Sequence, residues 1–267
     1  MRFRIHIDRL SKQQFIPINY QYELSSVIYK IIHRSDSEFS DFLHSRGYIA
    51  FGKQFRLFTF SRLSFDKYKV IKEAGRIEHY GTKASFEISF LVDRAAEEFI
   101  KGLFREQEFG LGDKISAVDY QVSSIEACTP PVFKNVMHYR ALSPLFIRRK
   151  RSHGGEDYLS PEHPDYLNLF AQNLLSKSKA YQEVLSDSEL PMERVPKIEL
   201  KPIGKIYKNG VKIKQITAEQ SMLIGYMFEF ELSAPAELQE IGYYAGFGHL
   251  NSQGFGCVEG VENGGGG

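Results

Sequence analysis

Two successive prolines, Pro130 and Pro131, divide this sequence into two stretches that show the same order of predicted elements. Consecutive prolines interrupt helices and central strands, so the pair marks a boundary between structural units. In the first stretch, apolar and charged residues alternate from Phe3 to Ile7, which predicts a half-buried strand. Apolar residues at helical spacing follow from Leu24 to Ile32. The whole order is strand, helix, strand, strand, helix and strand, at residues 3–7, 24–32, 55–63, 84–92, 93–106 and 115–125.

The second stretch repeats this order at residues 139–150, 164–184, 197–204, 222–232, 236–245 and 255–261, and Pro144 interrupts its first strand. We also predict a short helix over 39–43 that Gly47 ends, a short strand over 210–214, and Asp93 as a helix N-cap. Each set of six elements has the ferredoxin-like order. We therefore expect an α+β protein with two tandem ferredoxin-like (βαββαβ) domains, residues 1–129 and 132–262, and a flexible tail at 263–267.

Composition is that of a globular protein in water, with 42% hydrophobic and 25% charged residues. No apolar run has the length of a membrane span, and the first ten residues alternate in character, unlike a signal peptide. Two cysteines are too few for a disulfide framework or a thiolate metal site. We expect a cytoplasmic protein.

Charge is distributed unevenly along the chain. Residues 134–214 contain 15 Lys and Arg against 9 Asp and Glu, whereas residues 215–267 contain no Lys or Arg and seven Glu. Such a distribution suggests a basic face for a polyanion. Chance clustering on a solvated surface would produce the same counts, so charge alone leaves both interpretations open.

The most specific segment is Gly246–Gly256, in which two Gly-Phe-Gly triplets are separated by five residues. Its spacing is neither that of a dinucleotide fingerprint nor that of a P-loop. Glycines allow positive φ and let backbone N–H groups approach a partner such as a phosphate. A helix C-cap followed by a tight turn is the alternative, but one glycine would suffice for it. We therefore predict a binding loop in which Gly246, Gly248, His249, Asn251, Ser252, Gly254 and Gly256 contact the partner.

This segment resembles the C-terminal glycine-rich loop of the CRISPR-associated endoribonucleases of the RAMP superfamily, which process repeat transcripts. The first strand, the stretch Tyr20–Tyr29 and Phe42-Leu43-His44 are similar to that family as well, while the middle of the chain adds little. The resemblance implies metal-independent cleavage of CRISPR repeat RNA by an internal 2′-hydroxyl. The products would carry 5′-hydroxyl and 2′,3′-cyclic phosphate ends, and no cofactor would be needed. It also implies a monomer or homodimer, with other effector subunits as further partners.

The same resemblance implies which residues react. Such a cleavage needs a base, an acid and positive charge near the phosphate. His44 is at the position of the family's catalytic histidine, and Tyr29 at that of an orienting tyrosine. The cation is either Lys53 or Arg56. A histidine stabilised by a helix C-terminus is the structural alternative for His44, and His33 is the reserve candidate.

Further basic residues could bind phosphates. Arg148, Arg149, Lys150 and Arg151 form the densest cluster, and Lys201 and Lys205 extend it. A solvated basic loop is the alternative interpretation. The histidines at 153 and 163 fit no zinc spacing, so no metal is expected. A non-catalytic repeat-RNA-binding subunit of an effector complex remains the rival function, since it would share the fold and the glycine-rich loop.

Overall fold

The computed structural model describes residues 1–185, 196–213 and 221–261. Its N-terminal sheet is built around β1 (Arg2–Arg9), which pairs antiparallel with β11 (Ala117–Ala127) on one side and β9 (Lys83–Phe90) on the other. β5 (Phe58–Phe60) continues the sheet beyond β9. Helix α1 (Gln21–Ser35) connects β1 to β5, and α3 (Asp93–Arg105) connects β9 to β11. In sequence order the strands lie 4-1-3-2, as in a ferredoxin-like sheet.

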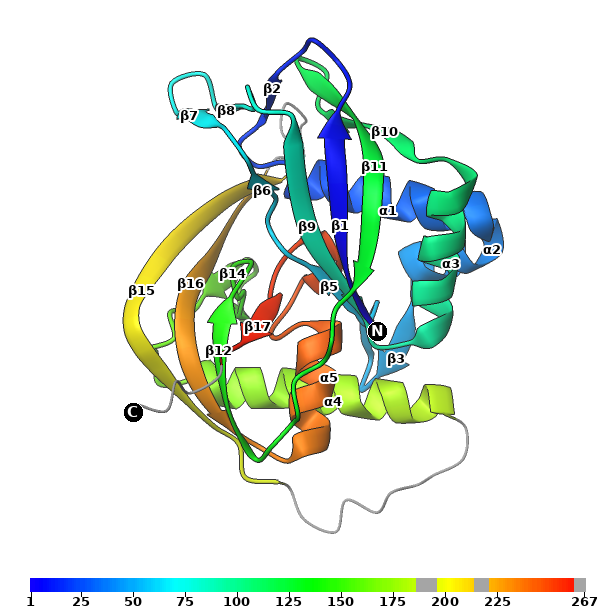
Figure 1. Cartoon of the computed structure of the whole chain (residues 1–267). Coiled ribbons are helices and arrows are strands. Elements are labelled where there is room, and N and C mark those ends of the chain that lie inside the picture. Colours follow the sequence, from blue (N-terminus) through cyan, green and yellow to red (C-terminus); the bar gives the residue numbers. More distant parts are fainter. Residues whose placement is uncertain (186–195, 214–220, 262–267) are drawn as a thin grey trace, which may run out of the picture.

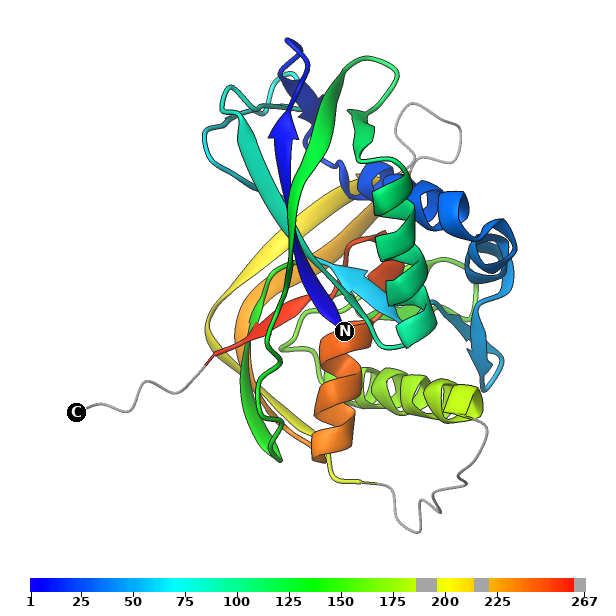
Figure 2. The same ribbon diagram turned by 45° about the vertical axis from the view of Figure 1, so that its right-hand side comes forward.

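The C-terminal sheet has the same spatial order. β12 (Val136–Ala141) lies between β16 (Ser221–Ser233) and β17 (Val258–Gly260), and β15 (Glu199–Ile213) forms the edge beside β16. The crossover helices are α4 (Tyr166–Leu185) and α5 (Ala236–Ala245). Figure 1 shows the two units stacked along the molecule, and Figure 2 shows the two sheets from a second side. The expected tandem of ferredoxin-like folds is therefore confirmed.

Both units also contain shorter elements. They are β2 (Phe15–Pro17), α2 (Ser37–Asp41), a π-helical turn (Phe42–Arg46), β3 (Tyr48–Ala50), β4 (Lys53–Phe55), β6 (Ser64–Phe65), β7 (Lys69–Ile71), β8 (Arg76–Glu78), β10 (Glu108–Gly112), β13 (Arg148–Lys150), β14 (Glu156–Tyr158) and a 3₁₀ turn (Asn251–Gln253). Among them, β3 with β4 and β13 with β14 form two hairpins that project from the sheets.

Several sequence expectations need correction. The strand expected over 55–63 is divided between Phe55, the last residue of β4, and β5, with Leu57 at φ 54° between them. The strand expected over 139–150, with its interruption at Pro144, is two separate strands, β12 and β13, which the segment 142–147 around Pro144 divides. The two strands expected over 197–204 and 210–214 form the single strand β15 up to Ile213, with an irregularity after Ile203 where Gly204 takes φ 67°; residue 214 lies outside the described residues. The N-cap of α3 is Val92, and Asp93 is the first helical residue, where its charge suits the helix dipole.

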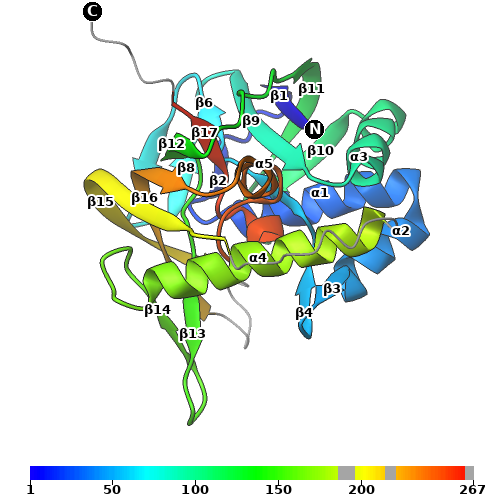
Figure 3. The same ribbon diagram turned by 90° about the horizontal axis from the view of Figure 1, so that it is seen from below.

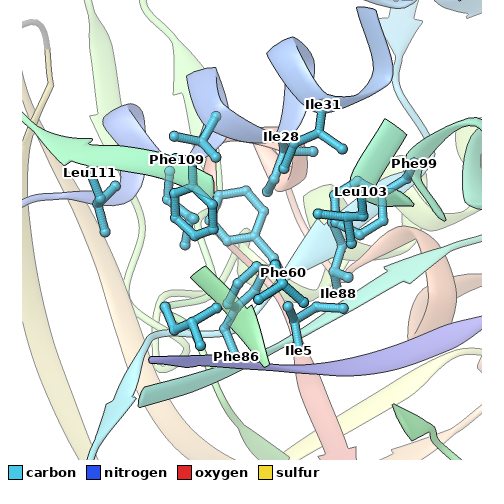
Figure 4. Close-up of a cluster of buried hydrophobic side chains, with 14 of the residues drawn as sticks. Ile5, Ile28, Ile31, Phe60, Phe86, Ile88, Phe99, Leu103, Phe109 and Leu111 are labelled. Carbon is cyan, nitrogen blue, oxygen red and sulfur yellow. The ribbon is translucent and has the colours of Figure 1, made fainter. Parts of the chain in front are cut away.

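The N-terminal core forms where α1 and α3 cover one face of their sheet. Ile28 of α1 and Phe99 of α3 meet Ile5 and Ile88 of the central strands, and all four side chains are fully buried (Figure 4). The helical spacing and the strand alternation noted in the sequence thus direct apolar side chains to one interface. Among the described residues, no helix is long and apolar enough to cross a membrane, and both cysteines are free thiols.

The two units are joined by buried hydrogen bonds. Arg2, which is 3% exposed, donates to the carbonyl oxygens of Tyr243 (2.8 Å) and Val258 (2.6 Å), and its guanidinium lies 3.6 Å from the centre of the Tyr243 ring. The Thr59 hydroxyl on β5 donates to the carbonyl of Phe255 (2.9 Å). These contacts fix the segment Gly246–Gly256 against the N-terminal unit.

Candidate functional site

A cavity of about 860 Å³ lies between the two units. Its walls are α1, the hairpin β3–β4, α4 and the glycine segment, defined as Gly246–Gly256. The lining includes Tyr29, His44, Lys53 and Arg56 from the N-terminal half, and Arg148, Lys150, Gly248, His249, Asn251 and Ser252 from the C-terminal half. Residues proposed from distant parts of the sequence thus meet at one site.

Tyr29 and His44 lie side by side in this cavity. Tyr29 is on the second half of α1, and His44 is on the π-helical turn that follows α2. Their ring centres are 5.4 Å apart at an angle of 81°. The turn ends at Gly47, which has φ 62° and where a Cβ would approach the carbonyl oxygen of Phe55 to 2.5 Å. A glycine is therefore required to bring the chain back past His44.

Arg56 supports this pair. Its guanidinium donates to the carbonyl oxygen of His44 at 2.6 Å. Burial raises the pKa of the Tyr29 phenol, and the Ser252 hydroxyl and Arg56 act against that rise. The phenol therefore keeps its proton at neutral pH. Ser252 comes from the glycine segment, and the Ser25 hydroxyl on α1 donates to its carbonyl oxygen at 2.6 Å.

Lys53 lines the same cavity from the start of β4, and its side chain is exposed. Within the described residues it has no ion-pair or hydrogen-bond partner, whereas Arg56 is held by the backbone of His44. The reserve candidate His33 is exposed on α1 and does not line the cavity. Of the two cations that the sequence left open, Lys53 is therefore the one whose charged group can move toward a ligand.

The glycine segment is shaped by packing. Gly246, Gly248, Gly254 and Gly256 all have φ between 75° and 85°. A Cβ on Gly256 would lie 1.9 Å from the carbonyl oxygen of Phe247, so only glycine fits. The N–H groups of Gly254 and Gly256 donate to the carbonyls of Asn251 and Pro144. These two N–H groups are used inside the protein, contrary to the phosphate role expected for them.

Asn251 and His249 are held inside the segment as well. The Asn251 amide donates to the carbonyls of Phe247 (3.1 Å) and Phe255 (2.9 Å). The N–H of His249 donates to the carbonyl of Phe146. Burial, together with the positive charges of Lys177 and Arg148, lowers the pKa of His249 to about 3. At neutral pH this ring is uncharged and cannot attract a phosphate as a cation.

The basic cluster at 148–151 divides between two environments. Arg148 and Lys150 line the cavity, whereas Arg149 and Arg151 pair with Asp157, and Arg149 also reaches Asp165. Arg148 itself pairs with Glu156 at 2.7 Å. Lys201 and Lys205 are exposed on β15 and do not line the cavity.

Sequence reasoning missed the wall formed by α4, to which Gln172, Asn173 and Lys177 belong. Lys177 is 2% exposed, and its ammonium group donates to the carbonyl oxygens of Gly246 and Gly248. Burial lowers the pKa of this amine. One signal was present in the sequence, because Lys177 continues the apolar spacing of Phe170 and Leu174 along the helix.

Comparisons with known proteins agree with this architecture. A family model described as CRISPR-associated protein Cas6, N-terminal, matches residues 15–126, and one described as CRISPR associated protein Cas6, C-terminal, matches residues 128–260. A Cas6 endoribonuclease-like protein of Pyrococcus furiosus is 29% identical over 98% of this chain and 99% of its own length. CRISPR-associated endoribonuclease Cas6 1 of Methanocaldococcus jannaschii is 28% identical over 93% of this chain and 88% of its own length.

The likeness extends to a solved structure. The product of a Cas6-related gene from Pyrococcus furiosus superposes with a TM-score of 0.80 and 26% identity, over 98% of this chain and 99% of that one. The two family models together cover nearly all the described residues, and the ferredoxin-like order holds in both units. The chain belongs to the Cas6 family of CRISPR-associated proteins.

Proposed function

We propose that this chain is an endoribonuclease that cuts CRISPR repeat RNA by attack of a ribose 2′-hydroxyl on the adjacent phosphorus, without a metal ion. The observation that supports this most is the placement of Tyr29, His44 and Lys53 around one cavity, with their side chains from three separate elements. The nucleophile belongs to the RNA, so the protein has only to move protons and stabilise charge.

The geometry supports a role for each group. His44 takes the proton of the 2′-hydroxyl, since an unprotonated imidazole nitrogen can accept a proton. Tyr29 keeps its proton because burial raises the pKa of the phenol, so it can donate a hydrogen bond that orients the reacting phosphate. Lys53 stabilises the negative charge and can give a proton to the leaving 5′-oxygen, which arginine cannot do. Arg56 positions His44 through its backbone.

We infer that the two domains divide the work. Residues 1–129 supply the reacting side chains, and residues 132–262 supply the opposite wall, where Arg148 and Lys150 face the cavity. An RNA strand in this cavity would contact both domains at once. Lys201 and Lys205 could contact only RNA that extends beyond the cavity.

The experiment is cleavage of end-labelled repeat RNA in excess EDTA, with analysis of both new ends. We expect cutting to persist and to leave a 5′-hydroxyl and a 2′,3′-cyclic phosphate. An RNA with a single 2′-deoxy substitution at the cut position should bind but stay intact, because its nucleophile is missing. Loss of cutting in EDTA with recovery on adding Mg²⁺, or cutting of the 2′-deoxy RNA, would contradict the mechanism.

The rival is a repeat-RNA-binding subunit that does not cut. It predicts retention of the repeat RNA by this chain with no product under any of these conditions. The same assay therefore separates the two functions, provided that binding is measured beside cleavage.

A further inference from the structure

Phe51 occupies a turn that does not favour it. Ala50 pairs with Lys53 across the hairpin β3–β4, so Phe51 and Gly52 alone form the turn. Both have positive φ, 50° and 69°. Two-residue hairpin turns with positive φ at both positions favour Asn, Asp or Gly at the first of them. A phenylalanine in this conformation is uncommon because its Cβ crowds the backbone.

Burial does not account for this residue either. Phe51 is 74% exposed and belongs to none of the three hydrophobic clusters of the protein's described part. An apolar ring that neither stabilises its turn nor fills a core is better explained by a ligand.

The surroundings of Phe51 indicate which ligand. A second hollow, of about 470 Å³, lies between the tip of this hairpin and α4, and Phe51, Lys53, Leu175 and Lys179 help to line it. Figure 3 shows the hairpin beside α4, and both of its strands contact that helix. Lys53 and Gln172 line this hollow and the catalytic cavity alike. A strand lying across the cavity would therefore reach the hollow directly past Lys53.

The chemistry of the hollow suits a single unpaired nucleotide. Leu175 and the Phe51 ring offer apolar surface, and Lys53 and Lys179 supply positive charge at its sides. Aromatic rings next to cations are how proteins hold unpaired bases and the phosphates between them.

We propose that Phe51 is a stacking platform for an unpaired nucleobase that flanks the cleaved phosphate. This inference rests on the proposed RNA cleavage. The base lies on the ring in the hollow between the hairpin and α4, while Lys53 contacts the cleaved phosphate beside it. Phe51 thus sets the register of the RNA, and the base it holds must be single-stranded.

The test uses substitutions that separate stacking from folding. Phe51→Asn suits the turn better, so its melting temperature should equal or exceed that of the wild type, while the KM for repeat RNA should rise about 5- to 150-fold, the usual effect of losing one stacked base. Phe51→Trp should keep KM near the wild-type value. Phe51→Leu should raise KM as Phe51→Asn does, because leucine is apolar but cannot stack. Phe104→Ala is the matched control, since Phe104 is 72% exposed on α3 and lines neither hollow.

A direct readout comes from RNAs with 2-aminopurine at successive positions around the cut, bound to a His44→Ala chain. Quenching at one position that disappears with Phe51→Asn supports the proposal. If the wild type cuts RNA but KM and fluorescence do not change with residue 51, or if Phe51→Asn melts earlier than the wild type, the stacking role is wrong. Absence of any cutting by the wild type would instead reject the proposed function.

Discussion

At the scale of single residues, the site depends on a few side chains that approach from different elements. His44 and Tyr29 are 15 residues apart in sequence and come from a π-helical turn and an α-helix. Periodicity could place each on its element, but the resemblance alone pointed to their meeting. Lys177 is the opposite case, a residue of the cavity wall that sequence reasoning missed. Its spacing matched an apolar stripe, and the carbonyl groups of Gly246 and Gly248 that accept its hydrogen bonds lie about 70 residues away in the sequence.

Replacing His44 by alanine tests its proton-transfer role. We expect cleavage to slow by roughly 10²- to 10⁴-fold, the usual loss when a general acid or base is removed. Affinity for repeat RNA should hardly change, because most contacts to RNA lie elsewhere. Single-turnover rates and a binding titration measure the two quantities. A His44→Ala chain that cuts at the wild-type rate would move attention to His33.

The two roles proposed for Lys53, charge stabilisation and proton donation, can be separated by replacing it with another cation. Lys53→Arg keeps the positive charge but cannot give up a proton. If Lys53 protonates the leaving oxygen, Lys53→Arg should cut about 10²-fold or more below the wild-type rate although it keeps the charge, and Lys53→Ala, which loses both, should be slower still. Single-turnover rates of both variants measure this. Wild-type cutting by Lys53→Arg would mean that charge alone is needed at this position.

His249 predicts a dependence of stability on pH. Burial lowers the pKa of its ring to about 3, while the unfolded chain should titrate near the ordinary value of 6.5. Below about pH 6.5 the unfolded chain therefore binds a proton that the folded chain does not bind. The free energy of unfolding consequently decreases as pH falls. The melting temperature of His249→Gln should drop less than that of the wild type between about pH 7.5 and about pH 5. His153→Gln, at an exposed turn, is the control and should follow the wild type; an equal drop for His249→Gln would contradict the assignment.

At the scale of elements, the hairpin β13–β14 shows how one basic run serves two purposes. Successive side chains of a strand point to opposite faces. Arg148 and Lys150 accordingly share the cavity face, and Arg149 turns to the acidic residues at 157 and 165. The sequence displayed four adjacent cations and could not sort them, because their acidic partners lie on the returning strand and on the segment before α4.

This sorting predicts unequal effects on RNA binding. Replacing Arg148 and Lys150 together by glutamine should weaken binding and reduce the slope of log K against log salt by about 1.4, at roughly 0.7 per phosphate contact on single-stranded RNA. The matched double variant, Arg149→Gln with Arg151→Gln, should change the slope much less. Filter-binding titrations over a range of salt give both slopes. Equal slopes for the two double variants would show that the residues of the cavity face make no more phosphate contacts than Arg149 and Arg151.

At the scale of the whole molecule, the tandem fold was predictable and its assembly was not. Element order followed from local periodicity and from Pro130-Pro131, so both sheets could be expected from sequence. The length of β15 depends on its pairing with β16, which a single sequence does not reveal, whereas Pro144 did indicate the interruption between β12 and β13. The cavity itself arises only when the glycine segment docks on α1 and β5, through contacts of residues some 200 positions apart.

Arg2 holds the residues on either side of the glycine segment, Tyr243 and Val258, and its removal should affect both stability and activity. Its side chain is 1% exposed and donates to two carbonyls of the C-terminal unit, at Tyr243 and Val258. Arg2→Ala would remove the donor to the Val258 carbonyl, leave the Tyr243 carbonyl with the longer bond from the Ser89 hydroxyl (3.4 Å), and open a gap beside the Tyr243 ring. We expect a loss of about 2–4 kcal/mol of unfolding free energy, by the cost of unsatisfied buried polar groups.

The matched control for Arg2 is Arg4, which lies on the same strand. Its side chain is 47% exposed and pairs with Glu87, so Arg4→Ala should cost less than about 1 kcal/mol. Urea unfolding of both variants measures the difference. Cleavage should fall in Arg2→Ala even where the chain remains folded, since Ser252 is held beside Tyr29 only while the two units stay docked. A destabilised Arg2→Ala chain that cuts at the wild-type rate under folding conditions would show that the N-terminal unit positions its reacting groups without the glycine segment.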